Sequence, residues 1–115
     1  MKEHPLTMAN DKHHNVYVVE LDEGVLKDKK FVAANPEYDP YLACLYVGMT
    51  GLKPEKRFKN HKSGNKANRF VQKYGLRLLP DLFEYYNPMT YRVAVAKEKE
   101  LAAELRALGH AVWQN

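Results

Sequence analysis

Glu98 is the first residue whose place in the sequence points to chemistry. It lies in a helical pattern from Met89 to Leu108 that ends at Gly109. At about 100° per residue, Glu98 falls in the middle of the apolar stripe of this helix. The stripe consists of Ala94, Leu101, Ala102, Leu105 and Leu108. An inward-facing carboxylate is costly unless it is paired with a cation or binds a metal, so the alternative to a metal site is an ion pair with Arg57 or Arg92.

Arg57 and His61 form a second candidate pair. They are four residues apart in a stretch with helical spacing, so they share one face of the helix. A guanidinium suits a phosphate group, and an imidazole can hydrogen-bond or relay a proton. The alternative is an exposed Arg and His on a solvated basic helix.

Two tyrosines and a glycine lie within runs that favour strands. Tyr17 belongs to the run NVYVVEL, and Tyr46 and Gly48 belong to LACLYVG. A tyrosine inside a strand commonly packs in the core with its hydroxyl hydrogen-bonded. A glycine inside a strand indicates a bulge or a close approach of another group to the backbone.

The segment from Lys53 to Arg77 is strongly basic. It holds nine basic residues and one acid, Glu55, for a net charge of +8, whereas the whole chain carries only +4. Such an asymmetry favours a surface that faces a polyanion, and the alternative is a solvated helical face. The residues predicted to contact nucleic acid are Lys53, Lys56, Lys59, Lys62, Lys66 and Arg69.

Hydrophobic patterning and turn residues predict the elements that position these side chains. Strands are expected over 15–21, 42–48 and 110–114, a further short strand over 76–79, and helices over 54–63, 66–74 and 89–108. This order predicts a small α+β domain with helices packed on a sheet. Residues 1–14 are expected to form a flexible arm and residues 15–115 a single domain, with the role of residues 22–40 left open.

Composition narrows the class of protein. Apolar residues make up 45% of the chain and charged residues 28%, which is typical of globular domains. The single Cys44 excludes an internal disulfide, and no cluster of Cys and His suggests a zinc site. The chain shows neither a secretory signal nor an apolar run long enough for a membrane span, so we expect a cytoplasmic protein with no membrane contact.

The order of these residues resembles the GIY-YIG nuclease superfamily. Asn15-Val16-Tyr17 stands where that family has Gly-Ile-Tyr, and Tyr46-Val47-Gly48 stands where it has Tyr-Ile-Gly. Met49-Thr50 is typical of the turn that follows the second motif. Arg57, His61 and Glu98 follow in the order of the family's Arg, His and metal-binding Glu. The resemblance extends from Asn15 over nearly the whole chain.

The resemblance implies a three-stranded antiparallel sheet flanked by helices. It also implies a divalent-metal-dependent endonuclease that hydrolyses phosphodiester bonds, with DNA as the leading substrate and Mg²⁺ (or Mn²⁺) held by Glu98. Tyr17 is the implied general base or water positioner, and Arg57 the group that stabilises phosphate charge. Tyr46 and His61 are the implied supporting groups or proton shuttles, and Asn115 matches an Asn that often follows the Glu helix.

The chain departs from the family in ways that keep other hypotheses open. Only the Tyr of the first motif is retained, and the connection between the motifs is longer than usual. The chain has no room for the targeting domain that most family nucleases carry, so we expect it to need a partner protein or a homodimer. The alternatives are a catalytically inactive nucleic-acid-binding module and a protein-interaction domain on the same fold.

Overall fold

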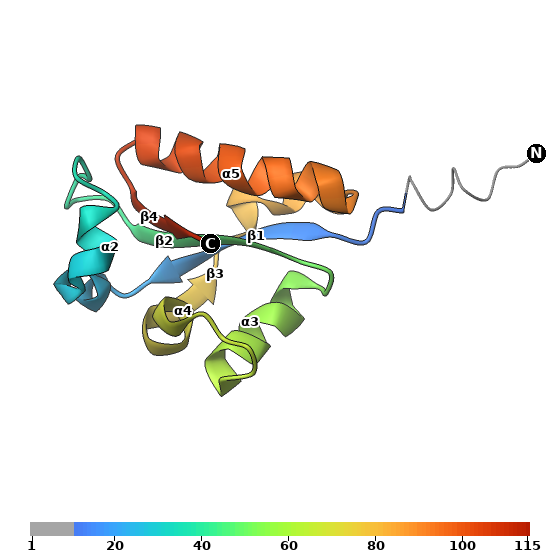
Figure 1. Ribbon diagram of the computed structural model, residues 1–115, viewed down its shortest axis with the longest axis horizontal. Coiled ribbons are helices and arrows are strands. Elements are labelled where there is room, and N and C mark those ends of the chain that lie inside the picture. The colour runs from blue at the N-terminus through green and yellow to red at the C-terminus, as the bar shows by residue number, and fades with distance from the viewer. Residues whose placement is uncertain (1–10) are drawn as a thin grey trace, which may run out of the picture.

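The computed structural model describes residues 11–115, and its sheet is built around β1 (Asn15–Leu21). This strand has the predicted bounds, and its β-branched and aromatic side chains are buried on both faces because helices cover both sides of the sheet (Figure 1). Most of the arm predicted over residues 1–14 lies outside the described residues. His14 is already attached to the fold, since its backbone exchanges two hydrogen bonds with Met89.

The sheet has four strands and is mixed. The strands run in the order β3-β1-β2-β4, with β2 at Cys44–Thr50, β3 at Gly75–Leu78 and β4 at Ala111–Gln114. β1 pairs antiparallel with β2 and with β3, as the predicted sheet requires. β4 pairs parallel with β2, so the prediction of a three-stranded antiparallel sheet is wrong.

The physical reason for the parallel pair is the long helix α5 (Tyr91–Ala107). β3 and β2 both run antiparallel to β1, so β3 has the direction of β2. α5 then carries the chain back across one face of the sheet (Figure 1), and β4 therefore enters in the direction of β2. A helical crossover of this kind joins strands that run the same way.

Helices pack on both faces of this sheet. α5 covers one face, whereas α3 and α4 lie on the other (Figure 1). α3 has the predicted bounds, because Pro54 occupies its first turn and Gly64 adopts a left-handed φ of 90° at its end. The remaining elements are η1 (Glu23–Lys27), α2 (Lys29–Ala33), α3 (Pro54–Ser63), α4 (Arg69–Tyr74), η2 (Pro80–Leu82) and η3 (Glu84–Tyr86).

α5 is shorter than its predicted range of 89–108. The Thr90 side chain caps it by accepting a hydrogen bond from the Val93 amide, which leaves Met89 outside the helix. Leu108 was expected in the buried stripe, but it lies beyond the last helical residue and is 70% exposed. The helical period therefore no longer directs its side chain to the core.

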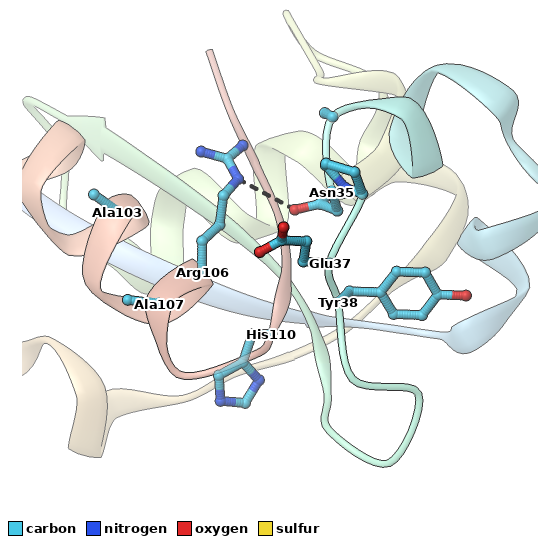
Figure 2. A pocket seen from close by; sticks show the side chains of 9 residues that line it. Asn35, Glu37, Tyr38, Ala103, Arg106, Ala107 and His110 are labelled. Carbon is cyan, nitrogen blue, oxygen red and sulfur yellow. Dashed lines mark hydrogen bonds between the residues drawn. The ribbon is translucent and has the colours of Figure 1, made fainter.

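Asn35 protects the outer edge of β4. Its side-chain oxygen accepts from the Val112 amide at 2.8 Å, and its Nδ2 donates to the Val112 carbonyl at 3.0 Å and to the Phe31 carbonyl at 2.9 Å. Arg106 reaches from α5 and donates through Nε to the same Asn35 oxygen at 3.1 Å (Figure 2). The buried amide thus replaces the neighbouring strand that β4 lacks on this side.

Asn35→Ala is expected to lower the free energy of unfolding by about 3 kcal/mol, because it leaves the Val112 amide without a partner in a buried position and removes one of the two hydrogen bonds to the Val112 carbonyl. Chemical denaturation measures the change. The adjacent exposed variant Glu37→Ala serves as control, with an expected change within about 0.5 kcal/mol. Equal stabilities for the two variants would contradict this role of Asn35.

Candidate functional site

A buried hydrogen bond joins the sheet to the basic helix α3. The Tyr17 hydroxyl on β1 lies 2.8 Å from Nε2 of His61 on α3, and both side chains are almost fully inaccessible. The backbone amide of Asn68 donates to His61 Nδ1 at 3.0 Å. Because a backbone amide can only donate, we assign the imidazole proton to Nε2, from which it is donated to the Tyr17 oxygen.

Tyr46 completes an aromatic cluster with these two rings. Its ring centroid lies 6.0 Å from that of Tyr17 and 5.7 Å from that of His61. Gly48 stands opposite Tyr17 in the strand register. A Cβ atom at Gly48 would lie 2.7 Å from the Tyr17 hydroxyl oxygen, so the absence of a side chain there leaves room for the phenol.

Arg57 is held in place by backbone carbonyls of the loop after α3. Its Nη2 donates to the Lys66 carbonyl at 2.8 Å and its Nη1 to the Asn65 carbonyl at 3.3 Å. Three of its five N–H donors are left for another ligand. A guanidinium that is fixed in this way can hold an anion with little further loss of side-chain freedom.

Glu98 faces inward, as the helical pattern predicts, and is only 8% exposed. The expected ion pair with Arg57 or Arg92 does not form, and no other cation within residues 11–115 pairs with this carboxylate. Its partner is the Gln114 side chain, whose Nε2 donates to Oε1 at 2.9 Å. Glu98 is therefore a buried carboxylate whose charge no salt bridge balances.

At the end of β4, hydrogen bonds link groups on the two faces of the sheet. β4 covers the edge of β2 as far as Val47, which pairs with Gln114, so the next β2 residues are uncovered on that side. Asn115 follows there, and its Nδ2 donates to the Tyr46 hydroxyl at 3.0 Å. Gln114 and Asn115 thus connect Glu98, from the α5 side, with the tyrosines on the α3 side.

The structure joins three of the predicted site residues, Tyr17, Tyr46 and His61, in one cluster, and α3 carries Arg57 beside His61. Glu98 lies on the α5 side and is linked to Tyr46 only through Gln114 and Asn115. Gly48 and Asn115 also contact this cluster. Thr50 shapes the turn beside it, because its Oγ1 accepts from the Leu52 amide at 3.0 Å.

Burial controls the protonation of the cluster. It raises the pKa of Tyr17 well above the ordinary value of 10.0, with the Tyr46 phenol raising it further and the Arg57 charge opposing the change. Burial also raises the pKa of Tyr46. Burial, together with the Arg57 charge, lowers the pKa of His61 to about 4. At neutral pH these three groups are neutral, so Tyr17 is not a phenolate base in the ligand-free protein.

Burial raises the pKa of Glu98 as well, and the hydrogen bond from Gln114, the Lys99 charge and the Met49 amide only partly oppose this. The Gln114 Nε2 that donates to this carboxylate also donates to the Asn115 carbonyl, and the Asn115 side chain in turn donates to the Tyr46 hydroxyl. Residues 11–115 contain no cluster of three or more His, Cys, Asp or Glu side chains. Glu98 is thus a single carboxylate, so a hard cation here would have to take its other ligands from water and a substrate phosphate.

The basic residues predicted to contact nucleic acid fall into two groups. Lys62 donates to the carbonyls of Gln72 and Gly75 at 3.0 and 2.9 Å, and Arg69 pairs with Asp28 at 2.9 Å, so both have internal partners. The others form no ion pair within the described part of the chain. These exposed cations are Lys53, Lys56, Lys59 and Lys66.

Sequence reasoning missed two residues that support the cluster. Asn68 is recognisable as an N-cap, since its side chain accepts from the amides of Phe70 and Val71, but its bond to His61 depends on the loop geometry. Gln114 gives no signal by itself. Its contact with Glu98 follows from the parallel register of β4, which the sequence does not specify.

A hollow lies beside Arg106, and none of the predicted site residues lines it (Figure 2). Two of its polar groups, the side chains of Asn35 and Arg106, are hydrogen-bonded to each other and to β4. We therefore interpret these two residues as structural and place the candidate site at the end of β4.

Comparisons of the chain with models of known protein families, with curated protein sequences and with solved structures found no match. The site is therefore interpreted from its own geometry. Within the described residues, no helix combines the length and the apolar character needed to cross a membrane.

The low pKa of His61 predicts a pH-dependent stability. The unfolded chain takes up this proton near pH 6.5, whereas the folded protein does so only near pH 4. Stability from neutral His61 is thus fully present above about pH 6.5 and falls by up to about 3 kcal/mol as the pH drops to 4. Chemical denaturation at a series of pH values from 7.5 to 4 gives the free energy of unfolding as a function of pH. Its slope corresponds to the protons taken up on unfolding, and His61→Gln is expected to reduce that number by about one. Identical slopes for the wild type and the variant would contradict the assignment.

Proposed function

We propose that this chain is a divalent-metal-dependent endonuclease that hydrolyses phosphodiester bonds in nucleic acid, with DNA as the leading substrate. The observation that carries the proposal is a buried carboxylate without a salt bridge within residues 11–115, Glu98, that is linked through Gln114 and Asn115 to the Tyr46 hydroxyl. Tyr46 packs beside Tyr17 and His61, and the helix that carries His61 also holds the fixed guanidinium of Arg57. The resemblance in residue order to GIY-YIG nucleases supports the same chemistry.

The reaction adds water to phosphorus and breaks one P–O bond, so negative charge builds on the phosphate oxygens. Arg57 has three free N–H donors for those oxygens, and its position is set before the substrate arrives. Glu98 would hold a Mg²⁺ or Mn²⁺ ion, which supplies Lewis-acid stabilisation of the same charge. Fixed donors and a cation in a partly buried site stabilise such charge more strongly than water does.

Tyr17 orients the attacking water in this proposal. Its oxygen accepts the proton of His61 Nε2, so its own hydroxyl hydrogen points to another acceptor. His61 acts as a positioning residue and not as a proton shuttle, because Nδ1 is occupied by the Asn68 amide and Nε2 already carries a proton. The raised pKa of Tyr17 likewise favours a hydrogen-bonding role over that of a resting base.

The basic surface supports binding through the phosphate backbone. Lys53, Lys56 and Lys59 project from the start and the exposed side of α3, the helix that carries Arg57 and His61. Contacts of this kind fix the orientation of a nucleic acid and carry little sequence information. We therefore expect weak sequence preference and strong salt dependence of binding.

Glu98→Gln is expected to abolish cleavage and to stabilise the fold. Purified protein is incubated with plasmid and branched DNA in Mg²⁺, in Mn²⁺ and in EDTA. We expect metal-dependent cleavage that falls by at least about 100-fold in the variant, and a free energy of unfolding about 1 kcal/mol higher at neutral pH, because the amide can accept from Gln114 without a buried charge.

Glu104→Gln on the same helix is the matched control, since Glu104 is exposed and forms no ion pair within residues 11–115. It should keep wild-type cleavage. Cleavage that survives Glu98→Gln would contradict the mechanism. Salt-sensitive DNA binding without cleavage in any metal would favour the inactive binding module instead.

A further inference from the structure

A second hollow adjoins the site on the α3 side. It has a volume of about 360 Å³. Its lining residues are Thr50, Leu52, Arg57, Asn60, Asn65 and Lys66. Arg57 therefore belongs both to the catalytic cluster and to the wall of this hollow, so a group that occupies the hollow lies directly beside the phosphate that Arg57 would hold.

The wall of the hollow is a fixed loop. Gly64 and Lys66 both adopt left-handed backbone conformations, with φ values of 90° and 51°. The value is unfavourable for Lys66, which has a side chain, and such strain is typical of functional loops. The strained turn directs the carbonyls of Asn65 and Lys66 onto Arg57, and the same loop brings the Asn68 amide to His61. The same loop therefore forms a wall of the hollow and holds the side chains of Arg57 and His61 in position.

The lining offers hydrogen-bonding groups that the protein itself does not use. Within residues 11–115, the side-chain amides of Asn60 and Asn65 form no hydrogen bond, and the Lys66 ammonium forms no ion pair. Each amide presents a donor and an acceptor. Leu52 adds an apolar surface and Arg57 a planar guanidinium. A flat heterocycle with donors and acceptors on its edge, joined to a phosphate, matches this set of groups.

We propose that this hollow receives an unpaired nucleobase next to the scissile phosphate, with Asn60 and Asn65 hydrogen-bonded to its edge. A base inside a duplex is stacked and already paired, so it reaches a concave site only after it leaves the helix. The preferred substrate is therefore nucleic acid with unpaired nucleotides, such as single strands, loops or branch points, rather than continuous duplex. This inference rests on the proposed function and adds the class of substrate.

The test measures binding of the full chain in EDTA, so that it does not depend on cleavage. The probes are a duplex with one unpaired 2-aminopurine, the same duplex with an abasic site, and a fully paired duplex. The double variant Asn60→Ala/Asn65→Ala is expected to lose about tenfold in affinity for the first probe alone, with a smaller rise in 2-aminopurine fluorescence, because the base loses stacking when it enters the hollow. Gln72→Ala, which removes an exposed amide on α4, should leave all affinities unchanged.

Equal wild-type affinity for the unpaired and fully paired probes would overturn the inference, as would a double variant that weakens binding to all three probes alike. Neither result would touch the catalytic proposal. Selective binding without metal-dependent cleavage would overturn the nuclease proposal and leave the base site standing. Absence of binding to every probe would overturn both.

Discussion

The hydrogen bond between the Tyr17 hydroxyl and His61 is the constraint on which the site depends. It joins the central strand to the basic helix, and its burial favours the neutral form of both partners by raising the pKa of Tyr17 and lowering that of His61. The Asn68 amide fixes the imidazole, and Gly48 leaves the space that the phenol occupies. Four segments of the chain therefore have to fold correctly before Tyr17 has its observed orientation.

Glu98, unlike the Tyr17–His61 pair, lowers the stability of the folded protein. A buried carboxylate with an amide partner and no cation costs free energy, and a well-folded chain gains nothing structural from it. Under the proposed function, a cation bound to Glu98 would offset this cost. Gln114 and Asn115, at the end of β4, link this carboxylate to the Tyr46 hydroxyl on the other face.

The local parts of this arrangement were predictable from the sequence. The bounds of β1 and α3, and the inward direction of Glu98, follow from strand alternation, the Pro54 and Gly64 signals and the helical period. The parallel pairing of β4 was not predictable, since it depends on how α5 crosses the sheet. The contacts of Gln114 and Asn115 depend on that pairing, and those of Arg57 on a strained loop, so periodicity does not reveal them.

In the proposed function, Glu98 holds a divalent cation beside a bound phosphate. The most direct test is paramagnetic broadening by Mn²⁺ of the amide signals of the protein, recorded with DNA whose phosphates resist cleavage. The account predicts broadening of Met49, Gln114 and Asn115 that depends on the DNA and is lost in Glu98→Gln. Broadening that persists in this variant, or that is centred on other residues, would contradict the account.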